Sequence, residues 1–267
     1  GRDDGSGWAG KEDRPAVPEE IRQRLKAARL QLEKDSVLAA KELVRKCIDR
    51  PTVKRFSDSW YEAAHLLGEI NIRIFSTGIH SDSKERYVVQ KGDTLIGIAK
   101  KFGTTVAAIQ KGNDLDPTNS TIFPGKTLQV YAGEWTMEVF KDEYVLLLFD
   151  DGELFKLYDV GIGRQNRTPT GVFEIKNKIR EPAWTKPGKR IPYGDERNVL
   201  GTRWMGLRPI RGTDETLSGY GIHGTWEPSS IGKKVSNGCI RMLNEDVEEL
   251  FDIVPTGTTL VIKKRDQ

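Results

Sequence analysis

The sequence predicts a multidomain protein with an N-terminal α-helical segment, a small α/β unit, and a mostly antiparallel β-sandwich or barrel with one flanking helix. Three observations predict this class. Apolar residues recur at helical spacing within 18–80, a strand–helix–helix–strand pattern occupies 87–131, and short β-rich runs separated by turns fill 134–263. A chain of 267 residues also suits two or three domains.

Composition narrows the function classes. A net charge of +3, from 42 basic and 39 acidic residues, argues against a dedicated nucleic-acid binder, which needs a concentrated basic face. No apolar run approaches the roughly 18 residues that span a bilayer, so no membrane span is expected. Residues 1–17 are largely Gly- and charge-rich and predict a disordered arm. Because the chain starts with Gly1, we expect that an upstream signal peptide or anchor has been removed.

Three helices are predicted within residues 18–80. The first begins near Pro18, the second ends before Pro51, and Ser57 to Ser59 offer N-caps for the third. Their apolar faces are Ile21, Leu25, Ala28 and Leu32; Val37, Ala40, Leu43, Val44 and Cys47; and Trp60, Ala63, Ala64, Leu67, Ile70 and Ile74. The arrangement resembles part of a tetratricopeptide array. Residues 18–76 are alternatively a helical spacer or a docking platform for a protein partner.

Residues 87–131 predict a compact unit of order βααβ. A strand at 87–90 and a turn precede two short helices that end at Gly103 and at Gly112-Asn113, and a strand at 127–131 closes the unit. The text YVVQKGDTLIGIAKKFGTTVAAIQKGNDL…IFPGKTLQVY resembles the LysM domain over its whole length. The resemblance implies binding to the N-acetylglucosamine strand of peptidoglycan.

The implied glycan groove of this unit lies between two loops. These loops carry Gly92, Asp93, Thr94 and Asn113. The same residues have structural interpretations, because glycine makes a turn, Thr94 caps a helix and Asn113 holds a left-handed position.

Residues 134–263 are dominated by β signals. Strands are expected at 136–140, 144–149, 154–160 and 171–176, with Asp151-Gly152 as a hairpin turn. The segment 178–200 is rich in Pro, Gly and charge and predicts a long surface loop. A helix at 244–254, capped by Asn244, and a strand at 258–262 complete the domain.

The β-rich segment also holds a candidate cysteine–histidine pair. Cys239 lies in Ser236-Asn237-Gly238-Cys239, sixteen residues after His223. A thiolate is a strong nucleophile, and an imidazole either accepts its proton or stabilises it as imidazolium. The Gly238 and Cys239 N–H groups are candidates for an oxyanion hole, and the Gly224 carbonyl is a candidate acceptor that fixes the imidazole tautomer.

The cysteines and the histidine also have interpretations other than catalysis. A lone cysteine and histidine in one domain are usually structural. A structural zinc site needs four Cys or His ligands and this domain offers two, so neither a metal nor a cofactor is expected. Cys47 belongs to a helical apolar face, and a Cys47–Cys239 disulfide is not expected because it would consume the nucleophile.

The β-rich segment resembles the L,D-transpeptidase catalytic domain of the YkuD type. The matching text is YGIHGTWEPSSIGKKVSNGCIRM, supported by GIGRQNRTPTGVF, IPYGDERNVLGTRWMGL and NEDVEELFDIVPTGTTLVI. The resemblance implies that Cys239 is the nucleophile and His223 the base. Arg241 would support the substrate carboxylate or the pocket wall. Many members have histidine where this chain has Asn237.

Trp204, Met205 and Ser236 are further candidates for supporting roles. Trp204 and Met205 match pocket-lining positions, although core packing explains them equally well. Ser236 is expected to bond the local backbone. Arg241 is alternatively a structural ion-pair partner.

The implied reaction is acyl transfer on peptidoglycan. The cysteine attacks the L-centre carbonyl before a terminal D-alanine of a tetrapeptide stem, and an amine of a second stem then takes the thioester, giving a 3→3 cross-link. Water or a lipoprotein lysine as acceptor would give a carboxypeptidase or an anchoring transferase. An inactive wall-binding scaffold and a generic cysteine hydrolase are the other hypotheses. The expected location is the periplasm or the cell wall.

Overall fold

The computed structural model describes residues 17–265 with the exception of residue 187. The predicted disordered arm, residues 1–17, lies outside the described residues apart from its last position. The described chain forms two compact units, and the boundary falls between Ile70 and Asn71, inside the third helix.

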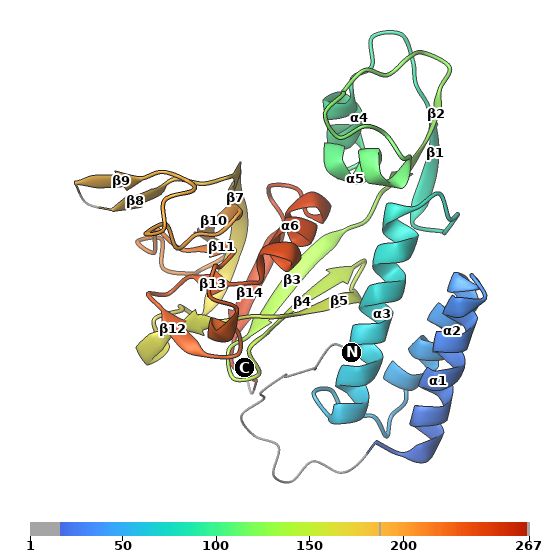
Figure 1. The fold of residues 1–267 in the computed structure, drawn as a ribbon, viewed down its shortest axis with the longest axis horizontal. Coiled ribbons are helices and arrows are strands. Elements are labelled where there is room, and N and C mark those ends of the chain that lie inside the picture. The colour runs from blue at the N-terminus through green and yellow to red at the C-terminus, as the bar shows by residue number, and fades with distance from the viewer. Residues whose placement is uncertain (1–16, 187, 266–267) are drawn as a thin grey trace. The chain divides into compact units, whose positions relative to one another are not determined.

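Figure 1 shows the elements in chain order. The helices are α1 (Glu19–Glu33), α2 (Val37–Ile48), α3 (Asp58–Ser76), α4 (Leu95–Lys101), α5 (Val106–Gly112) and α6 (Asn244–Ile253), with short 3₁₀ turns η1 (Arg164–Asn166) and η2 (Pro228–Ser230). The strands are β1 (Lys84–Val88), β2 (Thr127–Tyr131), β3 (Trp135–Phe140), β4 (Val145–Asp150), β5 (Glu153–Asp159), β6 (Ile162–Gly163), β7 (Gly171–Arg180), β8 (Trp184–Lys186), β9 (Lys189–Ile191), β10 (Arg203–Ile210), β11 (Gly221–His223), β12 (Lys234–Ser236), β13 (Ile240–Arg241) and β14 (Thr259–Lys263).

The first unit is helical, as predicted. The turn between α1 and α2 places Asp35 at φ 59°, and the Ser57 hydroxyl accepts a hydrogen bond from the Trp60 N–H at 3.3 Å, which caps α3. Cys47 is buried and its thiol is free, so no disulfide is present at this residue. The tetratricopeptide likeness of these helices stays a prediction.

The second unit begins with the βααβ element. β1 and β2 pair antiparallel, from Lys84 opposite Tyr131 to Val88 opposite Thr127. Hydroxyl caps start both short helices, because Thr94 accepts from the Gly97 N–H at 3.0 Å and Thr105 accepts from the Ala108 N–H at 2.9 Å. The helices and strands enclose a small core of their own, formed by Val89, Leu95, Ile98, Ala99, Ile109, Leu128 and Val130.

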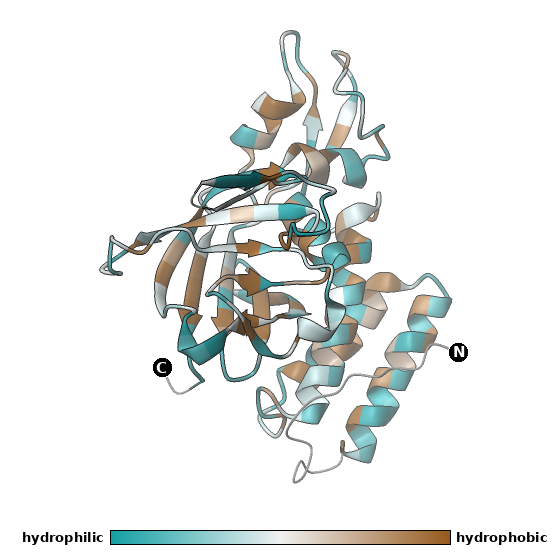
Figure 2. Cartoon of the chain, turned by 60° about the vertical axis from the view of Figure 1, so that its left-hand side comes forward, coloured by the Kyte–Doolittle hydropathy of each residue, from teal (hydrophilic) through white to brown (hydrophobic). Residues whose placement is uncertain are grey.

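An eight-stranded, curled sheet forms the rest of the second unit. The strand order is β13-β11-β10-β7-β14-β3-β4-β5, and the pairs β11–β13 and β14–β3 are parallel while the others are antiparallel. The β4–β5 hairpin turns through Asp151 and Gly152, both at positive φ, as the sequence predicts. Helix α6 flanks the sheet. Figure 2 shows apolar segments, drawn in brown, along the strands of the sheet.

Two sequence expectations for this region are wrong. The expected surface loop at 178–200 begins as the last residues of β7 and continues into a β8–β9 hairpin, because Trp184 and Thr185 pair with Ile191 and Arg190. Asn244 does not cap α6. Leu243 is the N-cap residue, and the Asn244 side chain accepts from the Thr202 N–H at 3.1 Å.

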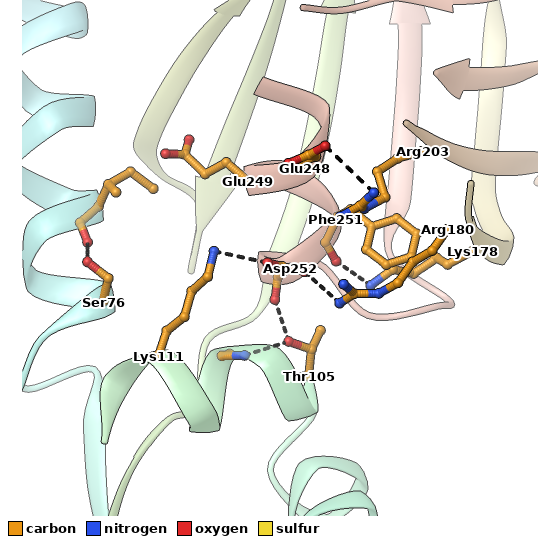
Figure 3. A network of polar contacts seen from close by, with 12 residues as sticks. Ser76, Thr105, Lys111, Lys178, Arg180, Arg203, Glu248, Glu249, Phe251 and Asp252 are labelled. Carbon is orange, nitrogen blue, oxygen red and sulfur yellow. Dashed lines mark hydrogen bonds and ion pairs between the residues drawn. The ribbon is translucent and has the colours of Figure 1, made fainter. Parts of the chain in front are cut away.

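The βααβ element and the sheet share a seam, drawn in Figure 3. The Asp252 carboxylate of α6 pairs with Lys111 of α5 at 2.9 Å and with Arg180 of β7 at 3.2 Å. The Thr105 hydroxyl donates to the Asp252 carbonyl. Ala108 of α5 also belongs to the main core beneath the sheet. These contacts hold the small element against the sheet.

None of the described helices combines the length and the apolar character that crossing a bilayer would require.

Candidate active site

The candidate nucleophile and base lie on neighbouring parallel strands. β11 ends with His223, Cys239 directly precedes β13, and the register places His223 opposite Arg241. Ile222 and Ile240 point into the core, where both are buried. Because side chains alternate between the faces of a sheet, His223 and Arg241 are directed to the other face. The Cys239 thiol, just before β13, donates to the Gly219 carbonyl at 3.7 Å. The fold therefore brings the residue predicted as nucleophile next to the strand that pairs with the strand of the predicted base.

The His223 imidazole is held in one tautomer. Its Nδ1 lies 2.6 Å from the Gly224 carbonyl oxygen. Since a carbonyl only accepts, Nδ1 carries the proton and Nε2 presents a lone pair. The Trp204 ring stacks on the imidazole with centroids 6.0 Å apart and planes inclined by 20°. The expected Gly224 contact is confirmed, and Trp204 is placed at the site.

Burial keeps the imidazole neutral. Desolvation lowers the pKa of His223 to about 4, although the Gly224 carbonyl opposes this change, and the nearby Arg241 charge lowers the pKa further. Burial also raises the pKa of the Cys239 thiol, against smaller lowering effects from the Gly221 backbone and from Arg241. The resting pair is therefore a neutral thiol and a neutral imidazole. Of the two expected modes of activation, this arrangement favours proton transfer to His223 during attack.

A hydroxyl organises the loop before the cysteine. Ser236 Oγ donates to the Cys239 carbonyl at 2.6 Å and accepts from the Gly238 N–H at 3.1 Å. The predicted backbone role of Ser236 is confirmed. The Gly238 N–H is occupied by Ser236 Oγ, which argues against its expected role in an oxyanion hole. The Cys239 N–H is the remaining candidate of the expected pair.

Thr168 is a site residue that sequence reasoning missed. Its hydroxyl donates to the Gly238 carbonyl at 2.9 Å and accepts from the Gly163 N–H at 2.8 Å. Its side chain is buried. Thr168 lies about 70 residues before the cysteine loop, and no local pattern signals such a contact. Only its place within the family-like stretch GIGRQNRTPTGVF could have drawn attention to it.

Arg241 sits beside the pair but is already ion-paired. Its Nη1 lies 3.1 Å from Glu227 Oε2, and its side chain is only 13% exposed. Its Nε is buried without a hydrogen-bond partner among the described residues. Arg241 therefore has the structural role weighed from the sequence, while its charge acts on His223 and Cys239.

Met205 does not line the site. It follows Trp204 on β10, and successive strand residues face opposite sides. Met205 is fully buried in the main core, so the core-packing interpretation is correct for it.

The four candidate glycan-binding residues have clear structural duties. Gly92 adopts φ 91° in the turn, and the Asp93 carboxylate accepts from the Tyr87 hydroxyl and from the Gln90 N–H, each at 2.7 Å. Thr94 caps α4 through its hydroxyl. These contacts hold the first loop of the predicted groove.

Asn113 locks α5 to β2. Its side chain donates to the carbonyls of Ile109 and Gln129 and accepts from the Gln129 N–H. The expected left-handed conformation is wrong for Asn113, which has φ −126°. The next residue, Asp114, adopts it at φ 51°.

Within the described ranges, no group of three or more His, Cys, Asp or Glu side chains is arranged to hold a metal ion.

Comparison with known proteins agrees with this geometry. Residues 134–262 match the YkuD L,D-transpeptidase catalytic domain, and residues 87–130 match the LysM domain. YkuD of Bacillus subtilis, a protein bearing the L,D-transpeptidase name, is 35% identical over 184 residues, which cover 67% of this chain and 98% of that relative. The chain belongs to the L,D-transpeptidase family.

Other known L,D-transpeptidases match shorter parts of this chain. YqjB of Bacillus subtilis, which bears the same family name, is 44% identical over 107 residues, covering 40% of this chain and 58% of that protein. A solved L,D-transpeptidase of Enterococcus faecium is 23% identical over 54% of this chain and 56% of its own, with a TM-score of 0.39.

Proposed function

We propose that this family member is a peptidoglycan L,D-transpeptidase that acts through a Cys239 thioester. The observation that carries the proposal is the His223 imidazole, whose Nδ1 donates to the Gly224 carbonyl. This contact leaves Nε2 free to accept a proton, and Cys239 directly precedes the strand that pairs with the strand of His223.

The first half-reaction forms the thioester. Cys239 gives its proton to Nε2 of His223 while Sγ bonds to the L-centre carbonyl carbon before the terminal D-alanine. The carbonyl oxygen gains negative charge, which the Cys239 N–H would stabilise. The C–N bond then breaks, and the leaving D-alanine amine takes the proton from His223.

The second half-reaction releases the enzyme. An amine of a second stem attacks the thioester carbonyl and gives a proton to His223. The C–S bond breaks and the sulfur recovers that proton. The product is a 3→3 cross-link between the two stems. Water in place of the amine would give a tripeptide, and a lipoprotein lysine would give an anchored protein.

The LysM domain supplies the second part of the proposed function. It would hold the glycan strand through the loops that carry Gly92, Asp93, Thr94 and Asn113, and so raise the local concentration of stem peptides. Such a protein would act in the cell wall or the periplasm. Residues 18–76 are proposed as a platform for a protein partner.

Muropeptides analysed by mass spectrometry test the chemistry. The wild type is expected to release D-alanine from tetrapeptides and to form dimers, whereas Cys239→Ala and His223→Gln lose at least 10³-fold in rate. Both variants should still co-sediment with insoluble peptidoglycan through LysM. Turnover that survives Cys239→Ala would overturn the thioester. A folded wild type that neither turns over muropeptides nor is acylated by a carbapenem would instead support the inactive scaffold.

A further inference from the structure

A short loop before β7 is fastened to the nucleophile loop. β6 pairs in parallel with β12, with Ser236 opposite Gly163. Thr168 then bonds both Gly163 and the Gly238 carbonyl. The two backbones approach so closely that a Cβ added to Gly163 would lie 2.8 Å from the Gly238 Cα. Residues 164–167, which join Gly163 to Thr168, are therefore held beside the loop that carries Cys239.

This loop carries two guanidinium groups that share one neutral acceptor. Arg164 Nη2 donates to Asn237 Oδ1 at 2.9 Å, and Arg167 Nη1 approaches the same oxygen at 3.5 Å. Both arginines are exposed. Asn237 lies two positions before Cys239. An amide oxygen carries no full charge, so it does not neutralise the two cations that it bridges.

Neither cation is neutralised elsewhere in the described part of the chain. No carboxylate there lies within ion-pair distance of Arg164 or Arg167, and the other acceptor of Arg167 is the Gln165 amide at 3.4 Å. Arg241, in contrast, is paired with Glu227. The uncompensated positive charge beside the loop that carries the nucleophile thus belongs to Arg164 and Arg167.

The backbone between the two arginines is strained. Gln165 and Asn166 both adopt left-handed conformations, with φ of 51° and 61°. Two consecutive residues of this kind are costly when neither is glycine, and such strain concentrates at ligand-binding sites. Here the reversal directs Arg164 and Arg167 to the same acceptor.

We propose that Arg164 and Arg167 form a carboxylate-binding subsite for the acyl donor, taking the terminal carboxylate of the leaving D-alanine. This inference rests on the proposed function for the identity of the donor. The Asn237 amide oxygen bridges the two guanidinium groups, which offer further N–H donors in the planar geometry that suits a carboxylate. These arginines, rather than the neutralised Arg241, set the preference for a free terminal carboxylate.

Alkylation of Cys239 tests the local charge without any peptidoglycan substrate. Iodoacetate and iodoacetamide both form a carbon–sulfur bond with loss of iodide, but only iodoacetate is an anion. The quantity measured is the rate of iodoacetate labelling at Cys239 divided by the rate of iodoacetamide labelling, followed by peptide mass spectrometry. This ratio is expected to fall about five-fold in Arg164→Gln/Arg167→Gln. Salt should reduce the wild-type ratio toward that of the variant.

The control removes two arginines from the far end of β10. Arg208, which is ion-paired with Glu174, and Arg211 are exposed and lie near and just beyond the end of β10 opposite to Trp204, which pairs with His223. Arg208→Gln/Arg211→Gln should leave the ratio within two-fold of the wild type. An unchanged ratio in Arg164→Gln/Arg167→Gln, with normal iodoacetamide labelling, would overturn the subsite.

A pair of donors tests the specificity. A tetrapeptide ending in D-alanine and the same peptide ending in D-alaninamide differ only in the terminal charge. The wild type is expected to prefer the carboxylate at least ten-fold in kcat/KM, mainly through KM, and the double variant should lose the preference. Equal preference in both proteins would overturn the subsite. Turnover of neither donor contradicts the proposed function, and the alkylation ratio alone then decides the subsite.

Asn237→Asp separates substrate binding from loop support. An aspartate keeps the acceptor and strengthens both contacts, so a purely structural role predicts normal activity and equal or higher thermal stability. The subsite predicts the opposite kinetic result, because the internal carboxylate competes with that of the donor. We expect the carboxylate preference to disappear while the melting temperature is kept. A retained preference would favour loop support alone.

Discussion

At the scale of single residues, Gly238 is the position where the backbone next to the nucleophile tolerates least change. Its φ is 133°, and an added Cβ would lie 2.7 Å from Tyr220 Cε1 and 3.1 Å from the Arg167 carbonyl oxygen. Gly238→Ala should therefore displace the Cys239 loop and slow iodoacetamide labelling or carbapenem acylation by about 10²-fold, as small displacements at reacting centres do.

Gly232→Ala is the matched control for backbone strain. Gly232 also has positive φ, at 75°, but an added Cβ would meet nothing within 4 Å. The variant should lose about 1 kcal/mol of stability and keep its acylation rate. Similar acylation rates in the two variants would show that the close contacts at Gly238 are unimportant.

The protonation state of the pair is a second prediction at this scale. Because burial raises the pKa of Cys239 and lowers that of His223, the rate of iodoacetamide labelling should rise with pH as a single step, with a midpoint above that of a free cysteine. Arg241→Gln should move the midpoint upward, since its charge lowers the thiol pKa. A labelling plateau between about pH 5 and 8 would indicate a thiolate–imidazolium pair instead.

Sequence reasoning predicted which residues the fold brings together better than it predicted the contacts around them. Cys239, His223, Gly224 and Ser236 could be found because their motif is contiguous or nearly so. The Thr168 contact could not, because it depends on β6 lying beside β12. The sequence could not decide between a pocket-lining and a core position for Met205, because a motif match does not tell which face of a strand a residue occupies.

At the scale of elements, helix α6 carries an acidic group with an unusual pKa. Burial raises the pKa of Asp246 to about 7, Lys156 opposes the shift, and the neighbouring carboxylates Glu249, Glu245 and Asp159 add to it. A native pKa above the unfolded value means that this group favours the fold fully below about pH 4. That contribution is lost as the pH rises through 7.

Asp246→Asn should remove this pH dependence. After allowance for partial exposure, we expect the variant to gain about 1–2 kcal/mol over the wild type at pH 8 and nothing at pH 4. Chemical denaturation across this pH range measures the difference. Glu248→Gln, which removes a charge on the same helix that is not among those raising the pKa of Asp246, is the control and should keep the wild-type slope. Parallel curves for Asp246→Asn and the wild type would contradict the prediction.

Element boundaries were well predicted wherever periodicity and caps agreed. Helices α1 to α5 and strands β3 to β5 follow their apolar spacing. The β8–β9 hairpin was missed because its residues are polar and lie between Pro and Gly, a composition typical of loops. The parallel pairing of β11 with β13 depends on tertiary structure, which no local pattern specifies.

At the scale of the whole molecule, an ion pair joins the LysM domain to the catalytic domain. Lys111 and Asp252 span their seam at 2.9 Å, with side chains 46% and 13% exposed. A double-mutant cycle with Lys111→Met and Asp252→Asn should give a coupling energy of about 0.5–1 kcal/mol by denaturant unfolding. The local pair Arg22–Glu19 in α1 is the comparison for an ion pair that bridges no seam. Zero coupling at Lys111–Asp252 would argue against a fixed seam.

Ala108 and Phe75 belong to the same buried cluster as residues of the catalytic strands, and this shared core bears on how the two domains evolve. The proposed glycan binding and acyl transfer would both depend on this one hydrophobic cluster, so the parts of the chain that carry them would unfold together. A substitution that loosens this cluster would therefore weaken wall attachment and catalysis in the same step. Selection that maintains one of the two proposed activities would also maintain the cluster on which the other depends. We therefore expect the two activities to be lost together.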